Sequence, residues 1–266
     1  PLSLKPRIVA KRHVMKDTID PEWIVDLARR AGDIANGYFG NTTGQLKSDK
    51  SWVTEADLAV EEFLREAIAA RRPQDAIIGE EGEKKSDVDA EYVWALDPID
   101  GTRVFNHSYP VWGVSIGVLK DHQPCLGAFI LPVLGDIYHT DGQTAFLNGQ
   151  PLAPPEPPID ENAIFLISEG AYKARTADYP GKVLSLGSAA AHLCYVARGS
   201  AVGAMDKAGV WDYAAGAAIL KVQGIQSRHV DGAEIDYASL YDGVAVDVPT
   251  LFAPEACFEV LAEAVR

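Results

Sequence analysis

The chain has 266 residues, of which 47% are hydrophobic, so it can bury a sizeable core as one large domain or as two coupled halves. Its formal net charge of −14 repels phosphodiester polymers, which argues against nucleic acid as the main partner. The three cysteines are far apart without C-x-x-C spacing, and no apolar window approaches a membrane span. We therefore expect a cytoplasmic protein with reduced thiols, no membrane segment and no nucleic-acid partner.

Two amphipathic helices are predicted in the first quarter of the chain. Asp20 is an N-cap residue followed by a proline, and the apolar stripe after it predicts a helix over 22–39. A capping-box pattern from Thr54 to Asp57 opens a second helix over 53–72. Each helix is thus predicted by a start signal and a helical period that agree.

Short apolar runs then predict sheet structure. Two runs that end in charged or glycine residues predict buried strands, and the longer stretches after them predict an antiparallel meander with an Asn148-Gly149 turn. The charged loop over 80–91 is either a solvated face or a flap over the site. The expected strands lie, in chain order, within 76–82, 92–97, 112–140 and 142–152.

A proline-rich stretch over 151–162 is the clearest break in composition and predicts a linker. We therefore expect a tail over 1–19, a first α+β domain over 20–150 and a second α/β domain over 151–266. In the second domain the pattern predicts strands over 163–168, 182–188 and 243–248, and helices over 188–199, 211–224 and 254–266.

Two aspartates, Asp97 and Asp100, lie three residues apart where an apolar run ends in a turn. Like charges are costly in a half-buried turn unless they are solvated, protonated or bound to cations. With the Ile99 carbonyl they offer hard oxygen ligands that suit Mg²⁺, and the N–H groups of Gly101 and Thr102 can meet an anion. A D-P-x-D-G turn without any metal explains the same residues. Acidic residues elsewhere favour the metal: Asp57, Glu80, Glu81 and Asp212.

The stretches "VTEAD", "GEEG", "DPIDGTRVF", "GSAA" and "WDYAAGA", in this order and spacing, resemble the inositol monophosphatase superfamily of Mg²⁺-dependent, lithium-sensitive sugar phosphatases. The resemblance runs over nearly the whole chain. It implies a mixed α/β (α+β) fold in which two sheets are sandwiched by helices in α-β-α-β-α layers, with the site between the two halves. It also implies a homodimer.

The same resemblance implies a set of metal ligands. Glu80, Asp97 and the Ile99 carbonyl would hold one Mg²⁺. Asp97, Asp100 and Asp212 would hold a second, so that Asp97 bridges the two ions. A third, looser ion would lie near Glu80.

Catalytic and substrate-binding roles follow from the resemblance as well. Thr102, oriented by Asp57, would help to deprotonate the attacking water, with Glu80 beside them. Glu81 is either a supporting acid or an exposed neighbour. The six histidines show no zinc-type pairing, so we expect them on the surface or in loops. The residues expected to contact the substrate are Asp100, Gly101, Thr102, Gly187, Ser188, Ala189, Asp206 and Asp212.

The function expected from these features is a phosphoric monoester hydrolase that acts on a small-molecule phosphate monoester, foremost myo-inositol monophosphate or a related sugar phosphate. Alternative substrates within the class are fructose 1,6-bisphosphate, 3′-phosphoadenosine 5′-phosphate and histidinol phosphate. A function of another class, protein interaction or regulation with a vestigial metal site, also stays open. No P-loop, G-x-S-x-G elbow or Cys-x₅-Arg loop is present to support a rival phosphate chemistry.

Overall fold

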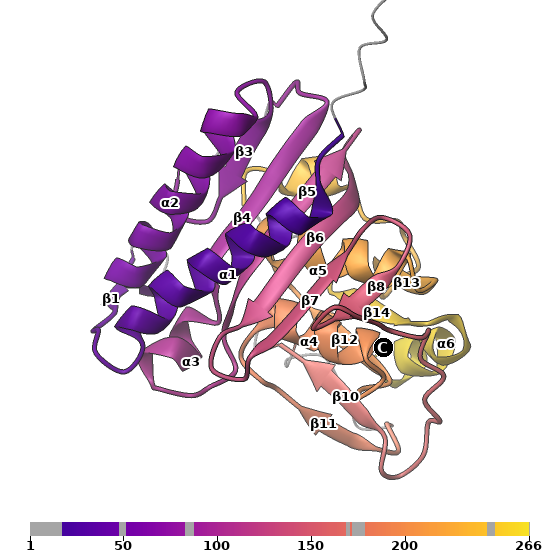
Figure 1. Cartoon of the computed structure of the whole chain (residues 1–266). Coiled ribbons are helices and arrows are strands. Elements are labelled where there is room, and N and C mark those ends of the chain that lie inside the picture. The colour runs from indigo at the N-terminus through magenta and orange to yellow at the C-terminus, as the bar shows by residue number, and fades with distance from the viewer. Residues whose placement is uncertain are drawn as a thin grey trace, which may run out of the picture.

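The computed structural model describes residues 18–47, 52–82, 88–168, 171, 179–243 and 248–265. In this part of the chain two large β-sheets alternate with three layers of helices (Figure 1). Helices α1 and α2 cover the outer face of a seven-stranded sheet, α4 and α5 lie between the two sheets, and α6 covers the outer face of a five-stranded sheet. The α-β-α-β-α layering confirms the predicted fold class.

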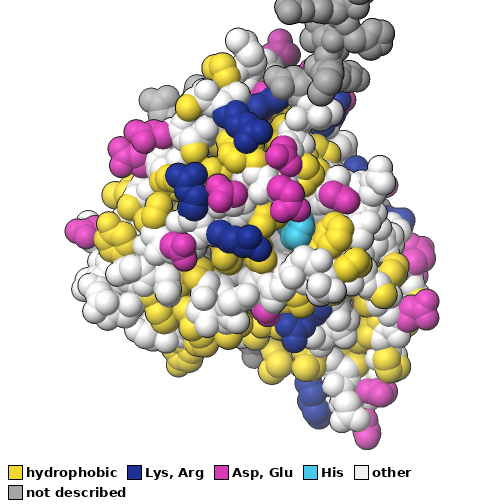
Figure 2. Space-filling model, in the orientation of Figure 1, with side chains coloured by type: hydrophobic (Ala, Val, Ile, Leu, Met, Phe, Trp, Pro, Cys, Tyr) yellow, Lys and Arg dark blue, Asp and Glu magenta, His cyan; other side chains and the backbone are white. Residues whose placement is uncertain are grey.

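The first layer consists of the two predicted helices. Helix α1 is Pro21–Tyr38, and the Asp20 side chain accepts a hydrogen bond from the backbone N–H of Glu22. Helix α2 is Glu55–Arg71 and begins with the predicted capping box. Their inner faces pack on the sheet, while the outer surface carries interspersed acidic and basic side chains (Figure 2). Two arginines there cover aromatic rings, with Arg71 4.4 Å from the centre of the Trp23 ring and Arg30 4.7 Å from that of Phe63.

The seven-stranded sheet has the strand order β3-β4-β5-β6-β7-β8-β9. Only β3 pairs in parallel, with β4, and every later strand pairs antiparallel with the one before it, which confirms the predicted meander. The bounds are β3 Ala76–Gly79, β4 Tyr92–Asp100, β5 Gly113–Lys120, β6 Gln123–Leu131, β7 Asp136–Thr140, β8 Ala145–Leu147 and β9 Gln150–Pro151. A five-residue helix, α3, Thr102–Asn106, follows β4 directly.

Two short strands that were not predicted form before α2. Strands β1, Gln45–Leu46, and β2, Trp52–Val53, pair antiparallel before α2. Two-residue strands are too short to give a period, so the sequence pattern could not reveal them.

The five-stranded sheet has the order β11-β10-β12-β14-β13, with β10, β11 and β12 parallel and β14 antiparallel to its neighbours. Successive residues of β10, β12 and β14 face opposite sides, so that Leu166 packs toward α4 and α5 while Ile167 packs toward α6. The bounds are β10 Ile164–Ile167, β11 Lys182–Leu184, β12 Gly203–Asp206, β13 Ile225–His229, β14 Thr250–Pro254, α4 Ala189–Ala197, α5 Val210–Lys221, the 3₁₀ helix η1 Tyr237–Leu240 and α6 Glu255–Ala264.

Strands β12, β13 and β14 were not predicted. β13 is a partly exposed edge strand with polar residues, so it forms no apolar run that sequence patterning detects. The strand predicted over 243–248 falls mostly on residues 244–247, which lie outside the described residues. The charged loop 80–91 and the tail 1–19 likewise include residues outside them.

The two sheets are built from successive parts of the chain, since β9 ends the first sheet and β10 begins the second. Helix α5 of the second half packs against β5 and β6 of the first, so the halves share a core. The division into two domains stays a prediction. Among the described residues, no helix is long and apolar enough to cross a membrane.

Candidate metal and phosphate site

Two aspartates at the end of β4 point to the same side because the strand is irregular there. In a regular strand, residues three apart face opposite sides of the sheet. Here Asp97 pairs with Ser115 and Asp100 with Gly113, so the register shifts between the two aspartates. A bulge of this kind re-aims side chains. As a result one carboxylate oxygen each of Asp97, Asp100 and Asp212 lies within 4.8 Å of the others.

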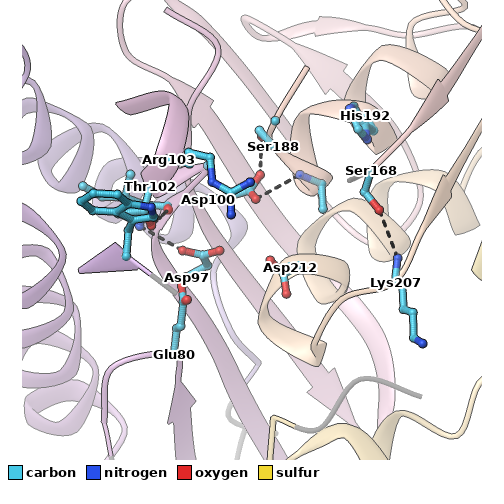
Figure 3. Close-up of a pocket in the computed structure, with 15 residues that line it drawn as sticks. Glu80, Asp97, Asp100, Thr102, Arg103, Ser168, Ser188, His192, Lys207 and Asp212 are labelled. Carbon is cyan, nitrogen blue, oxygen red and sulfur yellow. Dashed lines mark hydrogen bonds between the residues drawn. The ribbon is translucent and has the colours of Figure 1, made fainter. Parts of the chain in front are cut away.

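Asp212 reaches this cluster from the second half of the chain. It lies in the first turn of α5, and its Oδ2 accepts a hydrogen bond of 2.8 Å from the Gly209 N–H. Asp97 is fixed by its own turn, where its Oδ1 accepts the Ile99 N–H at 3.0 Å. Figure 3 shows Glu80, Asp97, Asp100 and Asp212 around one space. The predicted ligand side chains are therefore brought together from three separate segments.

Burial makes this group of acids electrostatically costly in the metal-free protein. Burial raises the pKa of Asp212 to about 7 and that of Asp100 to about 6, and the charge of Asp100 adds to the rise at Asp212. The pKa values of Asp97 and Glu80 are raised well above their ordinary range, first by burial and then by neighbouring carboxylates. A divalent cation would remove this repulsion, and closely spaced carboxylate oxygens are the ligands that such ions prefer. The residues present thus fit a metal centre.

A hydroxyl group adjoins the cluster. Thr102 Oγ1 lies 3.3 Å from Asp57 Oδ1 and 3.0 Å from the Ile99 carbonyl oxygen, so its single proton can be donated to one of them at a time. The other oxygen of Asp57 accepts hydrogen bonds from the backbone and hydroxyl of Thr54 in the capping box. Burial raises the pKa of Asp57 to about 6. The helix cap therefore aims Asp57 at Thr102.

The two halves of the chain meet at Asp100. Its carboxylate accepts hydrogen bonds from the Ser188 hydroxyl and from the N–H groups of Ala189 and Ala190, at 3.1 and 2.8 Å for the two amides. Asp100 thus caps the N-terminus of α4, where a negative charge is favourable. Gly101, with φ +92°, allows this approach, because a Cβ there would lie 2.9 Å from the carbonyl oxygen of Gly187.

Glu80 and Glu81 follow β3 and have a basic neighbour. Lys47 Nζ lies 2.5 Å from Glu81 Oε1 and 3.9 Å from Glu80 Oε1. Burial would lower the pKa of Lys47, but the hydrogen bond to Glu81 and the charges of both glutamates raise it above its ordinary value. The Glu81 side chain is only 7% exposed. Of the two alternatives left by the sequence, Glu81 is therefore a buried acid beside the site and not an exposed neighbour.

An open cavity of about 240 Å³ lies over the carboxylates. Most predicted site residues line it: Glu80, Asp97, Ile99, Asp100, Gly101, Thr102, Gly187, Ser188, Ala189 and Asp212. Five further lining residues were not predicted, namely Trp52, Arg103, Ser168, His192 and Lys207. Two of them could have been suspected from the sequence. Ser168 directly follows β10, and Arg103 directly follows the predicted site residue Thr102.

Asp206 does not lie where the substrate-contact prediction placed it. Its side chain is fully buried at the end of β12, behind His192, and does not line the cavity among the described residues. His192 Nδ1 lies 3.3 Å from both Asp206 oxygens, and His192 Nε2 accepts the Leu186 N–H at 3.0 Å, which places the proton on Nδ1. Asp206 therefore orients a histidine of the cavity wall.

This burial also corrects the expectation for the histidines. His192 is buried in α4, and His139 and His229 are buried in strands, whereas surface or loop positions were expected. Each shares a sheet or helix with apolar neighbours, and His139 stacks on Phe146 with ring centres 4.9 Å apart. The burial of a single histidine depends on its tertiary neighbours and cannot be predicted from the periodicity of the sequence.

Comparison with known proteins agrees with this architecture. The family model described as the inositol monophosphatase family matches residues 22–265. Inositol monophosphatase 3 of Solanum lycopersicum is 32% identical over 231 residues, 80% of this chain and 86% of that protein. A histidinol-phosphatase of Chlorobaculum parvum is 38% identical over 138 residues, which span 51% of this chain and 53% of that protein. The solved structure of an IMPase from Thermotoga maritima has a TM-score of 0.80 at 24% identity and covers 92% of this chain and 95% of its own.

The layered fold and the acidic site define a phosphoric monoester hydrolase of the metal-dependent type. The chain belongs to the inositol monophosphatase family.

Proposed function

We propose that the protein hydrolyses a small-molecule phosphate monoester with the help of Mg²⁺. The observation that carries this proposal is the convergence of Asp97, Asp100 and Asp212 within 4.8 Å of one another, next to the Thr102–Asp57 pair. Buried acids with raised pKa values are costly in their charged form, and a bound cation would stabilise that form. The site therefore has the chemistry of a centre that binds cations and a phosphate together.

The ligand assignment is part of this proposal. Glu80, Asp97 and the Ile99 carbonyl would hold one Mg²⁺, and Asp97, Asp100 and Asp212 a second. A third, looser ion would lie near Glu80. When bound, such ions supply positive charge to the phosphate and Lewis acidity to the water that attacks it. Lithium sensitivity, a homodimer and a cytoplasmic location are proposed with the same family assignment.

The chain's own residues then position the reactants and accept a proton. Thr102 Oγ1 donates toward Asp57, so the hydroxyl oxygen has lone pairs free to accept a proton from water while Asp57 accepts the proton of the hydroxyl. The backbone N–H groups of Gly101 and Thr102 would hold phosphoryl oxygens. Gly187, Ser188 and Ala189 also line the cavity and would contact the alcohol part of the substrate.

Myo-inositol monophosphate or a related sugar phosphate is the proposed substrate. Arg103 and Lys207 line the cavity beside the carboxylates. Two basic side chains favour an alcohol that is neutral or carries a further anionic group, such as fructose 1,6-bisphosphate or 3′-phosphoadenosine 5′-phosphate, over a cationic alcohol. Histidinol phosphate, whose alcohol carries an ammonium group, is therefore the less favoured alternative. One relative, which matches about half of this chain, is nevertheless a histidinol-phosphatase.

The test is phosphate release from these four substrates with Mg²⁺ and with EDTA. We expect Mg²⁺-dependent turnover of at least one, and a loss of roughly 10³-fold or more in Asp97→Asn, because a bridging carboxylate is removed. Asp33→Asn, the same change on the exposed face of α1, is the matched control. Turnover unaffected by EDTA or by Asp97→Asn would refute the metal assignment. No turnover of any substrate would refute the enzyme and leave an interaction or regulatory role.

A further inference from the structure

The segment that carries Glu80 leaves the sheet at its edge. β3 is the outermost strand of the seven-stranded sheet and pairs only with β4. The last sheet-like contact is the hydrogen bond of 3.2 Å from the Glu80 N–H to the Leu96 carbonyl. Because β3 is an edge strand, the backbone that continues beyond it has no strand on its outer side to hold it. Glu80 therefore needs another support if it is to hold a fixed position toward a cation.

A buried acid of α2 supplies that support. Glu61 is 3% exposed, and its Oε2 accepts the Glu81 N–H at 2.9 Å. Its other oxygen, Oε1, accepts the Nε–H of Arg65 at 2.6 Å. A buried carboxylate is tolerated when both oxygens are hydrogen-bonded and a cation is paired with it. Both conditions hold here, so Glu61 is fixed on one side by α2 and on the other by the backbone next to Glu80.

The helical spacing explains why one helix contacts the site twice. Glu61 follows Asp57 by four residues, so both carboxylates lie on the same face of α2. Asp57 faces Thr102, and Glu61, one turn further on, faces the backbone of Glu81. A rigid helix therefore fixes the distance between the hydroxyl side and the Glu80 side of the site.

Two glycines make room for this contact. A Cβ on Gly79 would lie 2.6 Å from Glu61 Oε1, and a Cβ on Gly82 would lie 2.1 Å from Arg65 Nη2 and 2.7 Å from Glu61 Oε1. Real Cβ atoms essentially never approach so closely, so a side chain at either position would require the ends of the Glu61 and Arg65 side chains to shift. The glycines on both sides of the two glutamates thus fit the buried pair.

We propose that Glu61 is a positioning residue, which holds Glu80 in place for cation binding through the backbone of Glu81. This inference rests on the proposed function, in which Glu80 binds a metal ion. Glu61 itself does not line the cavity and does not belong to the carboxylate cluster of the described residues. Its loss should weaken the binding of the cation at Glu80 and leave the chemical step intact once that cation is bound. Partners that orient a metal ligand in this way typically contribute 10- to 100-fold to metal affinity.

The experiment compares Mn²⁺ binding, by electron paramagnetic resonance, in the wild type and in two variants. Glu61→Gln keeps the size of the side chain but has one acceptor oxygen where two are needed. Gly82→Ala forces the ends of the Arg65 and Glu61 side chains to shift without changing any charge, so it tests the position of Glu61 separately from its charge. We expect roughly a tenfold or greater loss of affinity in both. Glu62→Gln, the same change at the next, exposed position of α2, should bind as the wild type does.

A second readout separates positioning from general damage. In steady-state hydrolysis, both variants should need more Mg²⁺ for half-activation and recover the wild-type kcat at saturating Mg²⁺, whereas a damaged fold would not recover. Circular dichroism identifies a variant that fails to fold. If one variant does not fold, the Mn²⁺ affinity of the other variant tests the inference. Mn²⁺ affinity in a folded Glu61→Gln or Gly82→Ala equal to that of the wild type would overturn the inference. Absence of Mn²⁺ binding in the wild type would instead refute the proposed function.

Discussion

The acidic site should make the metal-free protein less stable as the pH rises. Burial raises the pKa of Asp212 from 3.8 to about 7. A group whose pKa is higher in the folded state binds its proton more tightly there, so the free energy of unfolding falls as the pH rises from about 4 to about 7. At about 1.36 kcal/mol for each pH unit, the full loss from Asp212 is about 4 kcal/mol, of which about 3 kcal/mol falls between pH 5 and pH 8.

For a chain of this length, that loss corresponds to a fall in Tm of roughly 5–10 °C. The assay is thermal unfolding at pH 5 and pH 8 in excess EDTA, with Asp212→Asn as the comparison. Asparagine can still accept the Gly209 N–H but carries no charge, so the variant should melt higher than the wild type at pH 8 and close to it at pH 5. Added Mg²⁺ should raise the Tm of the wild type more at pH 8, because ionised ligands bind it.

Two results would refute this reasoning. The first is a metal-free wild type whose Tm does not fall between pH 5 and pH 8. The second is an Asp212→Asn variant that is no more stable than the wild type at pH 8, which would show that the carboxylate cluster is not under electrostatic strain.

Three further predictions concern single side chains. Thr102→Val, which keeps the shape but removes the hydroxyl, should lower kcat by roughly 10²- to 10⁴-fold with little change in KM, as steady-state kinetics would show; an unchanged kcat would exclude a proton-transfer role. Ser188→Ala removes a helix cap and a hydrogen bond to Asp100, so chemical denaturation should show a loss of about 1 kcal/mol; no loss would contradict the capping role. Lys207→Gln should raise KM for fructose 1,6-bisphosphate several-fold more than for inositol monophosphate, and equal changes would argue against a contact with a second anionic group.

Much of the fold could be predicted from local sequence. The caps at Asp20 and Thr54 and the apolar periods after them predicted α1 and α2, and the consecutive apolar runs predicted the meander. These elements bury one regular face, which leaves a period in the sequence. The second sheet was predicted only in part. Its edge strand β13, for example, is polar and partly exposed, so it leaves no apolar run in the sequence.

The site residues likewise fall into those that local sequence reveals and those that depend on tertiary contacts. Asp97 and Asp100 could be singled out because two like charges in one turn need a reason, and their proximity in space follows from a strand irregularity. Asp206 was predicted to contact the substrate, and Glu61 was not singled out at all. Each has its partner in another segment, His192 in one case and the Glu81 backbone in the other. Residues whose role depends on one tertiary contact leave no local pattern.

The bond network of Asp100 has a consequence for the order in which the molecule assembles. Asp100 and Ser188 are 88 positions apart in the chain, and Asp212 is further along still. Contacts of such long sequence separation form late, because the intervening chain must first be ordered. A nascent chain that ends before α5 would carry Asp97 and Asp100 without their third carboxylate. Binding of the ion assigned to Asp97, Asp100 and Asp212 should therefore appear only when both halves have been synthesised and docked, which makes it a reporter of complete folding.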